Sequence, residues 1–298
     1  MTFKSPERVP LIIVALAITL CSLVISGPAF ADATKAKEHF NNALKFAEEK
    51  NDSGAVAEYK AAIQEDPQYF DPYFNLGSHY FNTEKYADAE ANFKKATEID
   101  PKNADAWSGL GLTYAKESKF ADAETAYKAA LSNKPDFLDI YKYLGMLYQA
   151  QQQWAPMVDQ MKQYTEKKPD DPEGFYLLGK GYQSLKKYPD AINAFNKGAE
   201  LDKNDYNIYN ALGQIYQTQE NFAEAQKMFQ KVVALKPDNY QAHYNLAIAY
   251  EQLNSDKTDS VIVYWNRFLK VAKNNPRAQR LIPQAEEHVK ELQAAKGD

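Results

Sequence analysis

Residues 107–135 read WSGLGLTYAKESKFADAETAYKAALSNKP, and related stretches recur before and after them. In this stretch Gly111 follows Leu110, and Tyr114 comes four positions after the leucine. The leucine recurs every 34 residues, at Leu76, Leu110, Leu144, Leu178, Leu212 and Leu246. The glycine recurs at Gly77, Gly111, Gly145, Gly179 and Gly213, and the tyrosine at Tyr80, Tyr114, Tyr148, Tyr182, Tyr216 and Tyr250. A fixed period of this length indicates a repeat architecture rather than one central core.

The spacing within a unit predicts two helices. Trp107, Leu110 and Tyr114 are three and four residues apart, so they share one face of a first helix. Gly111 and Ala123 lack bulk where the first and second helices are expected to cross, and an aromatic ring fills the space beside them. Proline cannot continue a helix, and it ends most units, at Pro67, Pro101, Pro135, Pro169 and Pro237. We therefore expect an all-α protein.

This pattern resembles the tetratricopeptide-repeat (TPR) family, in which an aromatic residue, Leu-Gly, Tyr, Ala, a second aromatic residue and Pro recur in the same order. The resemblance covers residues 36–297 and implies a right-handed α-solenoid of seven helix-turn-helix repeats. The predicted repeats are 36–69, 70–103, 104–137, 138–171, 172–205, 206–239 and 240–278. Residues 279–298 are predicted to form a capping helix with one apolar face, made by Leu281, Ile282, Ala285, Val289 and Leu292.

The fourth predicted repeat, residues 138–171, departs from the pattern. Met157, Met161 and Tyr164 replace a small, an aromatic and a small residue, and Pro156 comes near the start of the second helix. Either the two helices pack more widely here, or the exposed side of the second helix binds a partner. We favour wider packing, because methionine readily fills irregular gaps.

The seventh predicted repeat has a longer inner turn, at residues 254–260. An alignment with about five extra residues places Tyr264, Phe268, Val271 and Pro276 in the columns of the second helix. We therefore expect a complete seventh repeat with an enlarged turn.

Residues 1–31 have the three parts of a secretory signal peptide. Two basic residues precede an uncharged apolar run at residues 9–25, and Ala29 and Ala31 form an Ala-x-Ala cleavage site. We expect cleavage and export to a bacterial periplasm. The alternative is an uncleaved anchor in the inner membrane formed by residues 9–25, a run at the short limit for a membrane span.

Composition narrows the classes of partner. The chain has 40 acidic and 35 basic residues and a formal net charge of -5. Such a chain has no basic field to follow phosphates, so neither a nucleic-acid partner nor a basic membrane-binding surface is expected. The one cysteine, Cys21, lies in the predicted signal peptide, which leaves the exported chain without a thiol and suits an oxidising compartment.

No motif predicts catalysis or a cofactor. Gly174, Gly179 and Lys180 imitate the spacing of a phosphate-binding loop, but Gly181 replaces the required Ser or Thr, and Gly179 is a regular repeat position. The four histidines have no partner at metal-ligand spacing. We therefore expect a non-enzymatic protein with no cofactor and no metal, and an enzyme or enzyme subunit is the less favoured alternative.

The TPR resemblance also implies a binding groove. In that family the concave face is lined mainly by the first helix of each repeat, at positions 2, 5, 6, 9, 12 and 13. The partner-binding residues implied here are Asp71, Asn75, Asp105, Asp139, Tyr143, Glu173, Tyr176, Asn210, Tyr244 and Asn245. The acids also suit the first turn of a helix through its dipole, while the amides and tyrosine rings suit an extended peptide or a sugar.

The expected function is an adaptor of the bacterial cell envelope that holds a protein or peptide in this groove. The alternative is a TPR element of an exopolysaccharide, pilus or protein secretion apparatus, with polysaccharide as a further ligand. A cationic clamp for chaperone C-termini is not expected, because the matching positions hold Phe40, Leu44, Asp105 and Gly109. A membrane is expected as a partner only if residues 9–25 stay uncleaved.

Overall fold

The computed structural model describes residues 32–295, and within them it contains helices and no strand. Each repeat has a first and a second helix. The first helices are α1 (Ala33–Glu48), α3 (Phe70–Asn82), α5 (Ala104–Lys116), α7 (Leu138–Ala150), α9 (Pro172–Ser184), α11 (Tyr206–Thr218) and α13 (Tyr240–Leu253). The second helices are α2 (Asp52–Glu65), α4 (Tyr86–Ile99), α6 (Phe120–Asn133), α8 (Trp154–Lys167), α10 (Tyr188–Leu201), α12 (Phe222–Leu235) and α14 (Thr258–Ala272).

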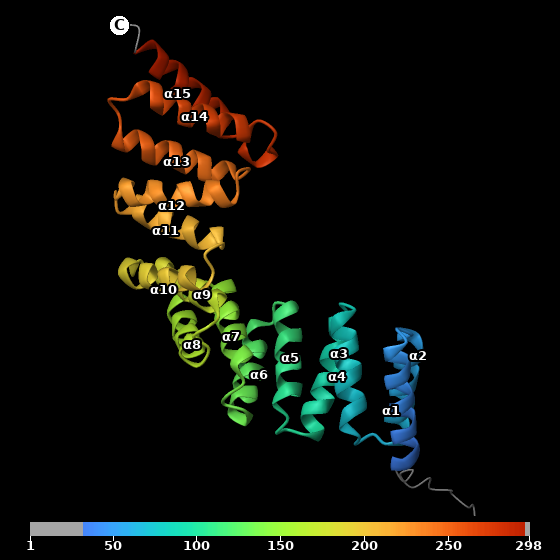
Figure 1. Cartoon of the computed structure of the whole chain (residues 1–298). Helices are drawn as coiled ribbons and strands as arrows, with labels where there is room; N and C mark the ends of the chain where they lie inside the picture. The colour runs from blue at the N-terminus through green and yellow to red at the C-terminus, as the bar shows by residue number, and fades with distance from the viewer. Residues whose placement is uncertain (1–31, 296–298) are drawn as a thin grey trace, which may run out of the picture.

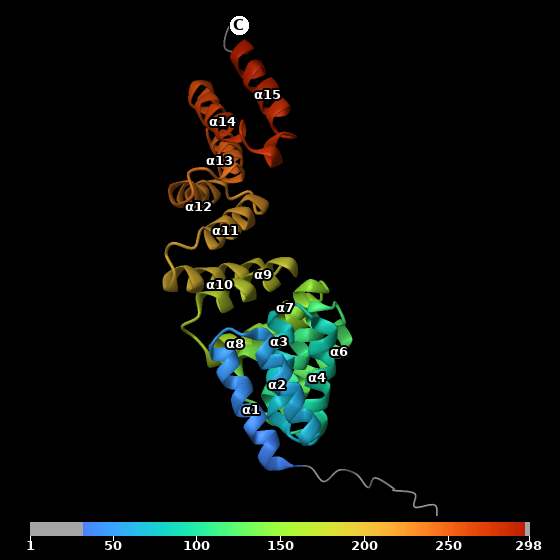
Figure 2. The ribbon, with the colours of Figure 1, turned by 90° about the vertical axis from the view of Figure 1, so that its right-hand side faces the viewer.

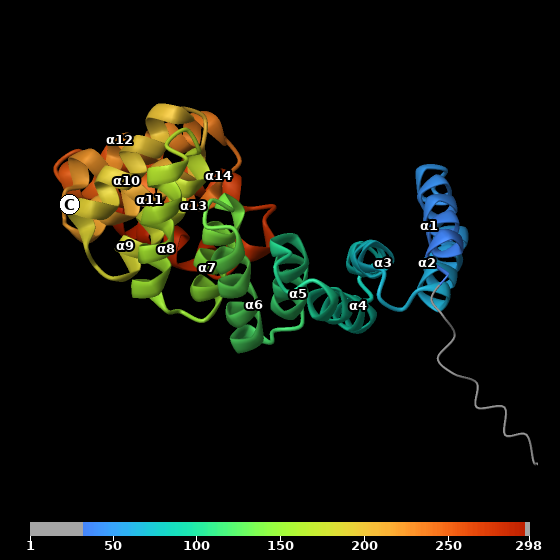
Figure 3. The same cartoon turned by 90° about the horizontal axis from the view of Figure 1, so that it is seen from below.

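The helix pairs stack in chain order into a long solenoid with α1 at one end and α15 (Ile282–Ala294) at the other (Figures 1 and 2). The stacking direction turns along the array, so the repeats from α9 onward run at an angle to the repeats before α8 (Figures 1 and 3). The expected all-α solenoid is confirmed. The predicted signal peptide, residues 1–31, lies outside the described residues, and no described helix is long and apolar enough to cross a membrane.

The repeated glycines give the rings of the second helices room to pack. A Cβ added at Gly111, Gly179 or Gly213 would lie 2.6–2.7 Å from the ring of Tyr127, Phe195 or Phe229, closer than real Cβ contacts allow. The three rings are buried, with at most 1% of their surface exposed. The glycine therefore sets how closely the two helices of a unit approach, as its period predicts.

The turn between the two helices is built the same way in six repeats. One residue per turn has a φ near 60°, at Lys50, Glu84, Ser118, Gln152, Lys186 and Glu220. In the second repeat the N–H of Lys85 then donates to the carbonyl of Tyr80 at 2.8 Å and closes the end of the first helix. This left-handed conformation favours glycine, yet none of the six residues is a glycine.

Replacing Glu84 with glycine is therefore expected to raise the free energy of unfolding by about 0.5–1 kcal/mol, because glycine adopts φ near 60° without the Cβ penalty. Urea denaturation followed by circular dichroism measures this change. Ala91→Gly in the exposed middle of α4 is the matched control and should lower stability by about 0.5–1 kcal/mol. Equal losses from both substitutions would contradict this account of the turn.

The seventh repeat corrects one sequence prediction. In the second repeat the second helix begins 16 residues after the first, at 86 against 70, whereas α14 begins 18 residues after α13, at 258 against 240. The lengthening is therefore two residues, and the expected five is wrong. The buried side chains of α14 are Val261, Trp265, Phe268 and Ala272. The expected cap is confirmed as α15, whose Ala285 and Val289 are buried against this repeat.

The fourth repeat buries its unusual residues. Met157 and Met161 are 0% exposed and Tyr164 is 1% exposed, so these side chains belong to the core. The Tyr164 ring occupies the space that a Cβ at Gly174 of the next repeat would need, at 2.7 Å. A large residue on α8 thus packs against a glycine on α9. The larger residue in the fourth repeat is therefore offset by a smaller one in the fifth. None of Met157, Met161 and Tyr164 is available to a partner.

An ion-pair cluster joins the second and third repeats. Glu90 on α4 accepts from Lys94 on the same helix and from Lys119 in the turn before α6, both at 2.5 Å. Burial alone would raise the pKa of Glu90, but the hydrogen bonds from Lys119 and Lys94 outweigh it and lower that pKa to about 2.

This cluster predicts an acid-sensitive part of the stability. The pKa of Glu90 is lower in the folded chain than its ordinary 4.5, so its contribution is complete above about pH 4.5 and is lost as the pH falls toward 2. We expect Glu90→Gln to be less stable than the parent chain at pH 6 and to show a smaller loss between pH 4.5 and 2.5. Urea denaturation at these pH values, with the exposed Glu98→Gln as control, measures it. Parallel pH profiles for parent and Glu90→Gln would contradict the assignment.

Candidate partner-binding groove

The first helices form the inner side of the solenoid. Neighbouring first helices contact one another, as α3 with α5, α5 with α7, α7 with α9 and α9 with α11. Successive second helices have no comparable contact among the described residues. Helices that lie closer together occupy the inside of a curved stack, so the concave face is lined by first helices, as the TPR resemblance implies.

The predicted binding residues lie on successive first helices, so they are spread along the array and do not converge on one point. By helix they are Asp71 and Asn75 on α3, Asp105 on α5, Asp139 and Tyr143 on α7, Glu173 and Tyr176 on α9, Asn210 on α11, and Tyr244 and Asn245 on α13. The arrangement suits an extended ligand that contacts several repeats. It does not resemble a compact catalytic centre.

The three predicted tyrosines are half-buried and partly structural. Tyr143 packs on Tyr127 of the preceding repeat with ring centroids 5.9 Å apart, while Tyr176 and Tyr244 pack on rings of their own second helices at 6.0 and 5.2 Å. Burial raises the pKa of Tyr143, and the charge of Asp139 adds to it. Burial also raises the pKa of Tyr176, so the hydroxyls of Tyr143 and Tyr176 keep their protons.

The acidic residues of the groove differ in their partners. Glu173 forms an ion pair with Lys142 of the preceding repeat. Asp105 and Asp139 are exposed, and neither makes a side-chain hydrogen bond or ion pair within residues 32–295. Two carboxylates near the middle of the groove are therefore available to a ligand.

The predicted asparagines of the groove also differ in whether their side chains already have a hydrogen-bond partner. The side chain of Asn75 already donates to the carbonyl of Asp71 in its own helix at 2.9 Å, so one of its two N–H groups is occupied. Asn210 and Asn245 make no such bond among the described residues. From α11 onward the inner positions carry further uncharged amides, at Asn207, Gln214, Gln217 and Gln241. This half of the groove suits the polar backbone of an extended chain.

An apolar hollow of about 280 Å³ lies on the inner face between α5 and α7, and sequence reasoning missed it. Tyr143 is the one predicted residue that lines it. Leu112 and Met146, both at position 9 of their repeats, provide apolar walls, and 47% of the Met146 surface is exposed. Position 9 is one of the groove-facing positions that the TPR resemblance implies, but no residue at this position is among the predicted binding residues.

The far end of the groove is closed by the capping helix. Glu251 on α13 accepts from the indole N–H of Trp265 at 2.8 Å and lies 2.9 Å from Nε2 of His288 on α15. Together with Tyr244 and Ile248 these residues border a hollow of about 320 Å³. The two residues are 37 positions apart, so spacing along the sequence does not indicate this pair. No cluster of three metal-ligand side chains occurs among the residues that the structure describes.

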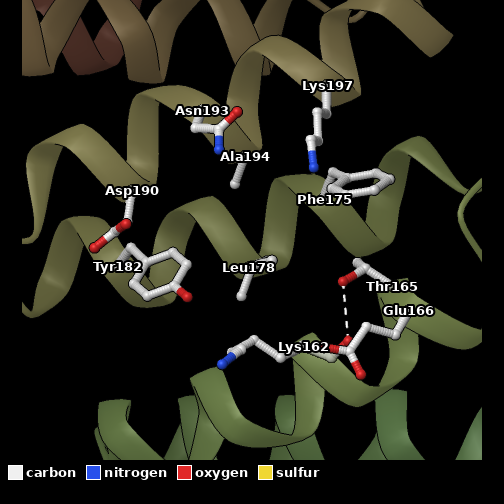
Figure 4. Close-up of a pocket in the computed structure, with 10 residues that line it drawn as sticks. All are labelled: Lys162, Thr165, Glu166, Phe175, Leu178, Tyr182, Asp190, Asn193, Ala194 and Lys197. Carbon is white, nitrogen blue, oxygen red and sulfur yellow. Dashed lines mark hydrogen bonds between the residues drawn. The ribbon is translucent and has the colours of Figure 1, made fainter.

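A third hollow, of about 210 Å³, lies on the side of the second helices, between α8, α9 and α10 (Figure 4). Its floor is Phe175 and Leu178, and Lys197 lies over the Phe175 ring at 5.7 Å. Charges of both signs surround it, from Lys162, Glu166 and Asp190. No single ligand chemistry follows from this mixture of charges.

Family models match most of the chain. Residues 160–278 match the family described as the TPR domain of cytochrome c-type biogenesis protein H. Residues 74–137 and 110–171 match a family described as tetratricopeptide repeat, and residues 43–83 match one described as TPR repeat. The sequence has no match among curated proteins.

Several solved structures are similar to this chain. The C-terminal part of a TPR repeat-containing protein from Cytophaga hutchinsonii superposes with a TM-score of 0.69 at 20% identity, covering 81% of this chain and 98% of that one. YrrB, described as a TPR protein with an unusual peptide-binding site, gives 0.57 at 22% identity, with 62% and 96% covered. PilF of Pseudomonas aeruginosa gives 0.56 at 20% identity, with 73% and 97% covered. At these identities the likeness concerns the fold.

Proposed function

Since the chain belongs to the tetratricopeptide-repeat family, we propose that it is a non-enzymatic adaptor whose concave face holds an extended segment of a protein partner. The observation that carries this proposal is the groove itself. Over several repeats the inner face offers unpaired carboxylates, free amides and an apolar hollow, and the carboxylates of Asp105 and Asp139 make no contact within residues 32–295 that holds neighbouring helices together. The buried leucine, glycine and ring columns that form the fold lie at other repeat positions than these carboxylates and amides.

Two similarities support a protein or peptide as the partner. YrrB is described as having a peptide-binding site, and its fold resembles that of this chain. The family matched by residues 160–278 is named for a biogenesis protein, which suits a helper in the assembly of another protein. A polysaccharide ligand remains the alternative from sequence, and no hollow in residues 32–295 specifically favours it.

The proposed place of action is the bacterial cell envelope. The support is the signal-like sequence of residues 1–31 and the lack of any cysteine beyond Cys21. Fractionation of cells and N-terminal sequencing of the isolated chain test this part. A mature chain in the periplasm supports export, a full-length chain in the inner membrane supports the anchor at residues 9–25, and a full-length chain in the cytoplasm contradicts both.

Photocrosslinking from the groove tests the adaptor function. A photoreactive side chain at exposed Gln214, on the inner face of α11, is expected to crosslink in living cells to one protein in stoichiometric amount. The same group at Val263, on the second helix α14 and 47% exposed, is the control and should not capture that protein. Equal capture from both positions, or capture of polymer alone, would overturn the proposal.

A further inference from the structure

We infer that the hollow between α5 and α7, together with Asp105 and Asp139, selects a partner segment in which a basic residue stands about three residues from a large apolar residue. The inference rests on the proposed function and adds the chemistry of the partner. The apolar side chain enters the hollow, and the basic side chain reaches the two carboxylates. Geometry, exposure and charge each support this occupant.

The geometry comes from two matching stripes on neighbouring first helices. On α7, Asp139, Tyr143 and Met146 follow one another at spacings of four and three residues and therefore share a face. On α5, Asp105 and Leu112 occupy the same positions, seven residues apart. Seven helical residues span about 10 Å, which equals about three residues of an extended chain. A segment lying between the two stripes thus meets carboxylates first and the hollow about three residues later.

The fold does not require apolar residues at position 9, where the hollow meets the groove. The two position-9 residues of the hollow are Leu112 and Met146, whereas the same position holds Ser78, Lys180 and Gln214 in other repeats with the same helix packing. Met146 nevertheless exposes 47% of its surface beside the ring of Tyr143. Exposed apolar side chains that the fold does not need, at the rim of an apolar concavity, mark a contact site for an apolar group.

The charges near the hollow favour a basic neighbour. Asp105 and Asp139 have no ion-pair partner among the described residues, whereas Glu173, the next acid in the row, is neutralised by Lys142. Among the described residues that line the hollow, Lys116 alone is charged, at the opposite end of the α5 stripe from Asp105. Two exposed carboxylates give modest affinity but strongly disfavour an acidic side chain at that end.

Three labelled peptides test the inference against the full chain by fluorescence anisotropy. The first is a 12-residue Gly-Ser peptide, on the order of the length of such recognition segments, with Arg and Phe three residues apart. The second has Glu in place of Arg, and the third has Ser in place of Phe. We expect the first to bind at least about fivefold more tightly than either of the others at low salt, with a smaller preference over the Glu peptide at high salt.

Variants locate the site. Met146→Glu is expected to weaken the Arg-Phe peptide about tenfold or more, and Asp105→Asn with Asp139→Asn to remove the preference for Arg over Glu. Val263→Glu is the matched control, because Val263 is also 47% exposed but lies on α14 outside the groove, and it should leave binding unchanged. Circular dichroism checks that all variants fold.

Each remaining outcome overturns the inference. Equal affinity for the Arg and Glu peptides would remove the basic residue from it, and binding unaffected by Met146→Glu would place the peptide elsewhere on the solenoid. Failure of all three peptides to bind would show that the hollow does not select this segment. These failures stay separate from failure of the adaptor function, because the crosslinking from Gln214 tests the groove at another repeat.

Discussion

Replacing Phe195 with alanine is expected to lower the free energy of unfolding by about 3–5 kcal/mol. The ring is 0% exposed and occupies the space that a Cβ at Gly179 would need, at 2.6 Å. Its removal leaves a cavity bordered by a glycine, which has no side chain to fill it. Urea denaturation followed by circular dichroism measures the loss.

The same substitution should also make unfolding less cooperative. Stability in a repeat array is close to a sum of repeat stabilities and contacts between neighbours, so a weakened fifth repeat separates the repeats before it from those after it. We expect a broader urea transition or two steps. Leu201→Ala, on the same helix but 45% exposed, is the control and should cost less than about 1 kcal/mol. Similar losses from both variants would contradict the assigned packing.

Tyr164→Ala is expected to cost about 3–5 kcal/mol, as the loss of a buried ring does. Tyr164 is 1% exposed, and its hydroxyl donates to the carboxylate of Asp171 at 2.5 Å. Burial raises the pKa of Tyr164, and the hydrogen bond to Asp171 adds to it, so the hydroxyl keeps its proton. The substitution removes both the ring and the donor.

Adding Gly174→Ile to Tyr164→Ala should recover part of this loss. The next repeat junction pairs Gly198 with a large Ile208, with the missing Cβ of Gly198 2.9 Å from Ile208, so a small residue on the second helix and isoleucine on the following helix already fit together in this array. Gly174→Ile alone should destabilise, because its Cβ would lie 2.7 Å from the Tyr164 ring. A double-mutant cycle in urea gives the coupling free energy between the two positions. Additive losses would contradict the proposal that the sizes of residues 164 and 174 compensate each other.

The repeat columns were predictable from the sequence because each has one physical reason that recurs. The glycine at Gly179 and its equivalents is needed for the opposing ring, and this need gives the 34-residue period a structural meaning.

The seventh repeat was harder to align. Its second helix is apolar at every position from Val261 to Trp265, so registers with two or five extra residues both match the pattern. Only packing against α13 and α15 selects one.

The sequence predicts which side of the solenoid forms the groove, but it does not predict which groups on that side are free to bind a ligand. The periodicity indicates which residues point inward, and Asp105 and Asp139 are exposed residues of the first helices. It does not show that Lys142 pairs with Glu173 across two repeats, 31 positions away, or that no neighbouring side chain covers Met146. Those features depend on the distance between successive first helices, which results from the packing of the second helices behind them.

Protection of single cysteines measures most directly whether the partner occupies the concave face. The chain has one cysteine, Cys21, so a Cys21→Ser background accepts a probe at Met146 or Gln214 on the inner face, or at Val263 on a second helix. The partner identified by crosslinking is then bound without a crosslink. In its presence maleimide labelling is expected to slow at least about tenfold at both inner positions and to stay unchanged at Val263. Slowed labelling at Val263 with the inner positions unprotected would contradict the groove as the binding site.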